Sequence, residues 1–285
     1  MECNGYEYWE KVSDEMPYPG MECDKGPSKT IGVTFFIAKN IERNDYVTTE
    51  NDIEIILAQL NKAFSPHGIN FKLREMVYAT GESPQLSKLR GNNPKETLEN
   101  WYKDVLKEDY NPNDLNFIFS PYSGFSCPSD LWELAPHVLI SRCQSAPANI
   151  RKTPMVHEVG HFFGLLHTHH NAEYITTLHE DRALNKLEDF RIRGPNWVNP
   201  KNECNKNGDY ICDTPLDCFD YCEDVLGCKG LKFCGDDYKP LTRNIMSYYP
   251  GYINGNFTKE QGARMRYFLM HRFKNNISGN TLMEY

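Results

Sequence analysis

One segment, HEVGHFFGLLH at residues 157–167, restricts what this chain can fold into more than any other feature. His157 and His161 lie four positions apart, so on a helix their rings project from the same face. Glycine tolerates positive φ, and Gly164 therefore lets the chain leave that helix sharply. His167 can then turn back toward the other two imidazoles. The segment predicts three histidines gathered around one metal ion.

The residues around this segment predict a well-held helix. Thr153 is a good N-cap, and Pro154 is a good first helical residue. Apolar side chains can pack much of the remaining helix surface into a core: Val156, Val159, Phe162, Phe163 and Leu166. Such packing would hold the two histidine rings in place.

Three neutral imidazoles leave the fourth position of a tetrahedral zinc ion open, which is typical of catalytic rather than structural zinc sites. Glu158 directly follows His157 and can reach a water molecule at that position. The metal lowers the pKa of this water, and the carboxylate takes its proton. Two histidines and a glutamate at this spacing also arise by chance on ordinary helices, but the added Gly164 and His167 favour the metal site.

The extended motif resembles the metzincin clan of zinc metallopeptidases. That resemblance implies a tight turn containing methionine further along, and RNIMSYYPG supplies Met246. In the clan the methionine lies beneath the metal, and a tyrosine two residues later, here Tyr248, can point at the site. A phenol there can donate a hydrogen bond to the oxyanion of the tetrahedral intermediate. The alternative for both residues is ordinary core packing.

Within the clan the chain is similar to the pappalysin or cytophagalysin-type family. The likeness is carried by HEVGHFFGLLHTH, by NGDYICDTPLD at 207–217, and by NIMSYY followed by FTKEQGARM. In that family the second segment lies near calcium sites. Asp209, Asp213 and Thr214 are therefore candidate calcium ligands, because hard oxygens suit that ion. The alternative is a turn held by the hydrogen bonds of Asx side chains.

The chain departs from the family in two places. The insert at 168–200 is long, and the loop after Met246 has no acidic residue. Relatives that prefer arginine after the scissile bond use an acid in that loop. The same basic preference is therefore not expected here.

The ten cysteines bear on the compartment in which the protein works. Six of them fall between residues 204 and 234. An even, clustered set favours disulfides and an oxidising environment. The alternative is a structural zinc site with four cysteine ligands, which the spacing of Cys218 and Cys222 would suit. The expectation is a secreted or extracytoplasmic protein.

Composition excludes some classes of function. The formal net charge of −8 gives no electrostatic footprint for nucleic acid. No apolar run approaches the roughly 18 residues that a membrane helix needs. The start, MECNGYEYWE, lacks the basic and apolar regions of a signal peptide, so we expect a secretion signal to have been removed.

Periodicity predicts strands alternating with helices. Strands are expected near residues 30–38, 69–79, 115–121 and 137–142, and helices near 53–60, 98–106 and 258–273. This pattern indicates a mixed sheet with helices packed on it.

Together with the resemblance, the pattern implies an α+β fold: a metzincin-like, two-lobed zincin domain with a mixed sheet, an active-site helix and a Met-turn. Residues 1–28 read as a tail or strap, and 29–285 as the catalytic domain. Its upper lobe would span about 29–164 and its lower lobe about 165–285.

The function that the resemblance implies is a zinc-dependent endopeptidase, with Zn²⁺ and a candidate Ca²⁺ as metals. A protein or peptide substrate would lie as an extended strand along the sheet edge. The alternative is a catalytically weak binding module on the same scaffold. The sequence does not fix the oligomeric state.

Overall fold

The computed structural model describes residues 27–40, 45–46, 48–79, 114–120, 127–128, 138–142, 153–168, 209–214, 243–247 and 255–276. The chain divides into two compact units. The first holds the described residues between 27 and 163 and between 266 and 276; the second holds those between 164 and 265. The second half of the last helix thus belongs to the first unit, whereas sequence reasoning placed that whole helix in the lower lobe. The expected lobes remain a prediction.

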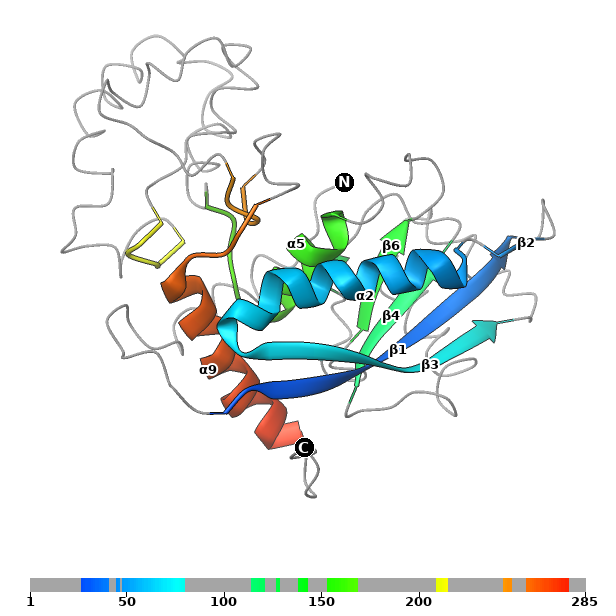
Figure 1. Cartoon of the computed structure of the whole chain (residues 1–285), viewed down its shortest axis with the longest axis horizontal. Coiled ribbons are helices and arrows are strands. Elements are labelled where there is room, and N and C mark those ends of the chain that lie inside the picture. Colours follow the sequence, from blue (N-terminus) through cyan, green and yellow to red (C-terminus); the bar gives the residue numbers. More distant parts are fainter. Residues whose placement is uncertain are drawn as a thin grey trace, which may run out of the picture. The chain divides into compact units, whose positions relative to one another are not determined.

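A six-stranded, largely parallel sheet forms the first unit (Figure 1). Its strands are β1 (Lys29–Asn40), β2 (Asp45–Tyr46), β3 (Ile69–Ala79), β4 (Leu115–Ser120), β5 (Cys127–Pro128) and β6 (Val138–Arg142). The order is β2-β1-β4-β6-β5, and β3 also pairs with β1. The pairs β1–β3, β1–β4 and β4–β6 are parallel, whereas β2 and β5 run antiparallel to their neighbours.

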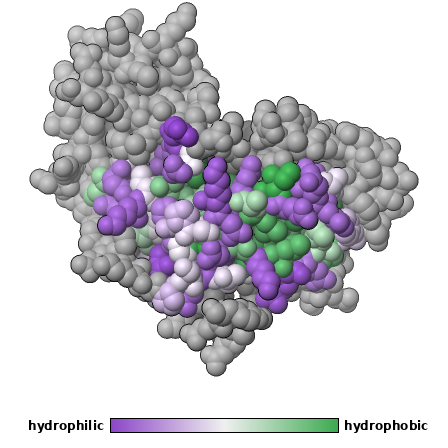
Figure 2. All heavy atoms as spheres, viewed as in Figure 1, coloured by the Kyte–Doolittle hydropathy of each residue, from purple (hydrophilic) through white to green (hydrophobic). Residues whose placement is uncertain are grey.

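Helix α2 (Glu50–Phe64) connects the parallel strands β1 and β3, and lies over the sheet in Figure 1. Thr49 caps the helix through a reciprocal pair of hydrogen bonds with Asp52. The helix ends in the 3₁₀ turn η1 (Ser65–His67), after which Gly68 adopts φ 74° and the chain reverses into β3. Figure 2 shows hydrophilic residues over much of the described surface on this side, as expected for a helix that buries only one face.

The core of this unit is rich in aromatic side chains. The Phe35 ring stacks on Phe117 at 5.0 Å and on Phe119 at 5.7 Å between centroids. A second group forms where α2 meets α5 (Thr153–Phe162): Phe64 lies edge-on to both Phe71 and Phe163. These rings fix α5 against α2 and β3.

The predicted strands near 30–38, 69–79, 115–121 and 137–142 are confirmed by β1, β3, β4 and β6. The helices expected near 53–60 and 258–273 are confirmed by α2 and by α9 (Lys259–Asn276). The helix expected near 98–106, most of the tail 1–28 and almost all of the insert 168–200 lie outside the described residues. In the part of the chain that the structure describes, no helix combines the length and hydropathy needed to cross a membrane.

Candidate metal centre

Helix α5 ends at Phe162, two residues before Gly164. The amide of Phe163 donates to both Val159 O and Gly160 O at 3.1 Å, which tightens the last turn. Gly164 then adopts φ 81°, a conformation that costs residues with a Cβ more than it costs glycine. The chain leaves the helix here and runs on to His167. The helix begins at Thr153, one residue earlier than predicted, so Thr153 is its first helical residue rather than the N-cap before it. The side chain of Thr153 is not among those described.

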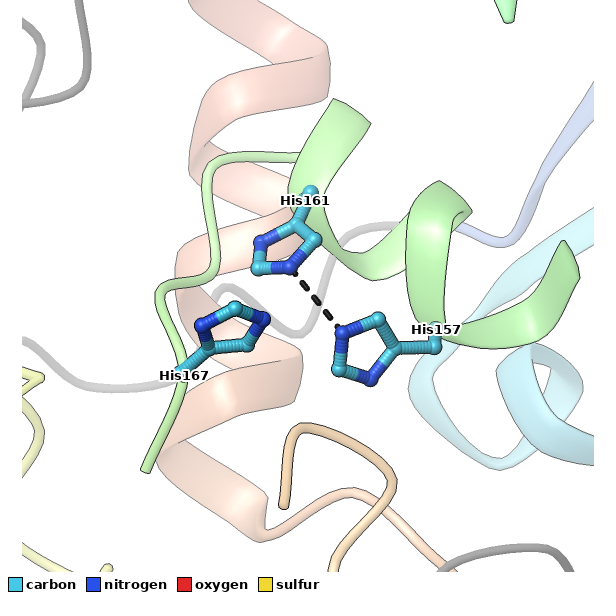
Figure 3. Close-up of side chains that lie close together, drawn as sticks. All are labelled: His157, His161 and His167. Atoms are coloured by element: carbon cyan, nitrogen blue, oxygen red, sulfur yellow. Dashed lines mark hydrogen bonds between the residues drawn. The ribbon is translucent and has the colours of Figure 1, made fainter. Parts of the chain in front are cut away.

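The side chains of His157, His161 and His167 come together at the end of α5 and the segment that follows it (Figure 3). One ring nitrogen from each lies within 4.8 Å of those from the other two. The Nε2 atoms of His157 and His161 are 3.1 Å apart, and their rings are perpendicular at 87°. His157 is buried, at 5% exposure, and the other two are half-buried. Among the described residues, this is a group of side chains able to hold a metal ion.

The geometry fits zinc. At a Zn–N distance of 2.0–2.1 Å, two ligands of a tetrahedral ion lie about 3.3 Å apart. The distance of 3.1 Å between the Nε2 atoms of His157 and His161 is close to that value. Three nitrogen donors without a fourth protein ligand would leave one position open.

Apolar packing holds this helix, as its sequence predicts. The apolar side chains of the helix and of the turn after it are at most 6% exposed: Met155, Val156, Val159, Phe162, Phe163, Leu165 and Leu166. Phe163 contacts the rings of Phe64 and Phe71. Because the apolar faces are fixed, the imidazoles on the remaining face have little freedom to separate.

Glu158 lies on α5 directly after His157 and is half-buried. A side chain there is partly accessible to solvent while its backbone belongs to the same rigid helix as two of the histidines. Its role as general base stays a prediction.

The turn containing Met246 is closed by two hydrogen bonds from its own residues. The Ser247 amide donates to Asn244 O at 3.1 Å, and the Met246 amide donates to Asn244 Oδ1 at 2.8 Å. Met246 O in turn accepts from the amide of Thr168 at 3.0 Å. The fully buried Met246 is thereby tied to the residue that follows His167. Tyr248 lies outside the described residues, so its proposed contact with an oxyanion stays a prediction.

Sequence reasoning missed a buried amide pair beside this turn. The side chains of Asn244 and Gln261 donate to each other, at 2.9 Å and 3.1 Å. Gln261 also accepts from the amide of Thr258 at 2.8 Å, while Thr258 Oγ1 accepts from the amide of Gln261 at 3.2 Å. This is a capping box at the start of α9. The spacing TKEQ at 258–261 could have indicated the capping box, but no local pattern indicates the pairing of Gln261 with Asn244.

Residues 209–214 form a polar turn whose atoms are largely satisfied by protein groups. Asp209 accepts from the amide of Ile211 at 3.2 Å and from Thr214 Oγ1 at 2.7 Å. Burial raises the pKa of Asp209 to about 7, against the lowering effects of Thr214 and Arg264. The Arg264 guanidinium donates to the carbonyl of Asp209 at 2.8 Å, and burial lowers its pKa.

The same turn is joined to α9. Asp213 accepts from Thr258 Oγ1 at 2.6 Å and from the amide of Glu260 at 2.9 Å, close to the positive end of the helix. Glu260 accepts from the amide of Cys212 at 2.7 Å. Cys212 is disulfide-bonded, but the predicted pattern of disulfides lies mostly outside the described residues. The structure contains a hydrogen-bonded turn at these residues. Calcium binding by Asp209, Asp213 and Thr214 stays a prediction.

Comparison with known proteins adds a limited similarity. No protein-family model matches the chain. The sequence is 25% identical over 195 residues to an extracellular metalloprotease of Neurospora crassa, covering 65% of this chain and 57% of that protein. The chain thus spans little more than half the length of this curated relative. Among solved structures, metalloproteinase-II from Bacteroides fragilis aligns with a TM-score of 0.33 and 14% identity, over 56% of this chain and 51% of that one. A likeness of that size supports no conclusion by itself.

Proposed function

We propose that this protein is a zinc-dependent peptidase whose metal is held by His157, His161 and His167. The observation that carries the proposal is the grouping of the three ring nitrogens within 4.8 Å, at the end of one helix and the turn after it. The sequence similarity to an extracellular metalloprotease supports the same reaction class.

Within this proposal Zn²⁺, when bound, supplies a Lewis acid that polarises a carbonyl and lowers the pKa of water. The three imidazoles bind in the neutral form and leave room for substrate. Glu158 takes a proton from the attacking water as its oxygen bonds to the carbonyl carbon, and then delivers that proton to the leaving amine as the C–N bond breaks. Tyr248 donates a hydrogen bond to the developing oxyanion.

The finer proposal is a two-lobed, metzincin-like endopeptidase of the pappalysin type, working outside the cytoplasm on protein or peptide substrates. It rests on the motif HEVGHFFGLLH, on Met246 in a tight turn and on the cysteine content. The candidate calcium ligands Asp209, Asp213 and Thr214 belong to this finer proposal.

The test compares metal content with peptide hydrolysis in two variants. Glu158→Gln keeps the metal ligands but removes the proton acceptor, so zinc content is expected to stay and turnover to fall by about 10²-fold or more. His167→Ala is expected to lose both zinc and turnover. Near-normal turnover in Glu158→Gln would contradict the assigned base. A wild-type protein that binds zinc and unfolded protein but cuts neither protein nor peptides would favour the binding module instead.

A further inference from the structure

The amides of Asn244 and Gln261 connect the Met246 turn to the first turn of α9. Asn244 Nδ2 donates to Gln261 Oε1 at 2.9 Å, and Gln261 Nε2 donates to Asn244 Oδ1 at 3.1 Å. Both residues are buried, at 2% and 0% exposure. Changing either side chain would leave polar atoms of the other buried without a partner, so this pair resists separation.

Each amide oxygen also accepts a backbone hydrogen bond, and this fixes the orientation of the pair. Asn244 Oδ1 accepts from the amide of Met246 at 2.8 Å. Gln261 Oε1 accepts from the amide of Thr258 at 2.8 Å. Turning either side-chain amide over would point its NH₂ group at a backbone N–H. The pair therefore has one favourable arrangement, which places the Met246 turn relative to the first turn of α9.

The same connection reaches the third histidine. Met246 O accepts from the amide of Thr168, the residue after His167, at 3.0 Å. Thr168 is buried, at 3% exposure, so solvent does not readily replace this bond. A continuous set of buried hydrogen bonds thus runs from Gln261 through Asn244 and Met246 to the backbone beside His167.

We infer that Asn244 and Gln261 are positioning residues for the metal ligand His167, an inference that rests on the proposed function. Neither side chain needs to touch metal or substrate, because both act through the carbonyl of Met246. His157 and His161 are fixed by the packing of α5, whereas His167 lies beyond the glycine that ends the helix. Buried Leu165 and Leu166 hold the chain before His167, and its position also depends on what holds the segment after it.

The variant Gln261→Glu separates the link to Asn244 from the cap on α9. A glutamate retains an oxygen for the amide of Thr258, and glutamate is common at this place in a capping box. Its charge is also favourable near a helix N-terminus. It lacks the Nε2 donor, so Asn244 Oδ1 loses one of its hydrogen bonds. Asn244→Asp breaks the link from the other side, because it retains the acceptor for Met246 and removes the Nδ2 donor.

Asn61→Asp provides a matched control in the first unit. Asn61 Nδ2 donates to Phe71 O at 2.9 Å, and its Oδ1 accepts from the amide of Phe71 at 2.8 Å. The aspartate keeps the acceptor and loses the donor, as in the test variants. This change weakens the attachment of α2 to β3 without altering the hydrogen bonds that lead to His167.

The experiment measures hydrogen exchange at residues 165–168 in metal-free protein, and zinc affinity by competition with a chelator. Gln261→Glu and Asn244→Asp are each expected to speed exchange at Thr168 about tenfold. Each is expected to weaken zinc binding about tenfold, in the range for residues that orient ligands. Asn61→Asp is expected to lower the melting temperature while leaving both quantities at wild-type values.

Wild-type exchange and zinc affinity in a folded Gln261→Glu or Asn244→Asp would overturn the inference. So would equal changes in Asn61→Asp, because the effect would then reflect loss of general stability. Neither measurement uses peptide hydrolysis. If the variants show the expected differences but the wild-type protein cuts no peptide, the positioning role is supported and the proposed function is contradicted.

Discussion

Replacing Asp209 by asparagine is expected to change how stability depends on pH. Asp209 is 3% exposed, and burial raises its pKa from 3.8 to about 7. The native state therefore favours the protonated carboxyl more strongly than the unfolded state does. Asparagine resembles that neutral form and cannot ionise, so the stability of the variant lacks the pH dependence that Asp209 contributes.

The sign follows from counting protons. Below about pH 4 both states of the wild type are protonated at Asp209, and its contribution to stability is fully present. Between about pH 4 and pH 7 the native state binds a proton that the unfolded state has released, so stability is lost as the pH rises. At about 1.4 kcal/mol per pKa unit, a pKa raised from 3.8 to about 7 corresponds to a total of about 4 kcal/mol.

The assay is urea unfolding of wild type and Asp209→Asn at several pH values between 4.5 and 7.5, with a calcium chelator present. As the pH rises, the free energy of unfolding of Asp209→Asn relative to that of the wild type is expected to increase by roughly 1 kcal/mol per pH unit. A constant difference over this range would refute the reasoning, because the carboxylate would then be ionised throughout. Repeating the series in excess calcium tests the calcium hypothesis. A bound cation would favour the ionised form and lower the native pKa of Asp209, so the pH trend should weaken or disappear.

Two further predictions concern the metal centre. Gly164→Ala places a Cβ on a residue with φ 81°. It is expected to lower the free energy of unfolding by about 1 kcal/mol or more and to weaken zinc binding. Gly164→Asn should cost less stability, because asparagine tolerates positive φ better than alanine. Equal stability and zinc affinity in Gly164→Ala would show that the turn does not depend on glycine. Tyr248→Phe is expected to lower the turnover number toward the lower end of about 10²–10³-fold, with little change in stability. An unchanged turnover number would remove the phenol from the chemical step.

Elements whose determinants are local in sequence could be predicted. The β-branched and aromatic run at 29–40 forms β1, and the apolar spacing of Ile53, Ile56 and Leu60 buries one face of α2. Thr49 closes a capping box with Asp52, three residues further along the chain. Periodicity and caps act within a few residues, so the sequence displays them directly.

Contacts between distant residues could not be predicted in this way. Asp114, the residue before β4, is fully buried and accepts hydrogen bonds from Thr34 of β1 at 2.8 Å and Arg74 of β3 at 2.8 Å. The residues next to Asp114 in the sequence do not indicate which distant residues bind it. Only strand order, with β1 between β3 and β4, brings the three together.

The candidate metal centre combines both kinds of determinant, and this explains which part of it was found from sequence. Two histidines project from one helix face, and a glycine ends that helix, so the motif alone indicates where His157 and His161 lie. The backbone after His167 is bonded to Met246, whose turn depends on Asn244 and Gln261. Those residues lie far along the chain, and each resembles an ordinary polar residue. A motif thus identifies the ligands, while hydrogen bonds that no motif records are what would keep the third one within reach of the metal.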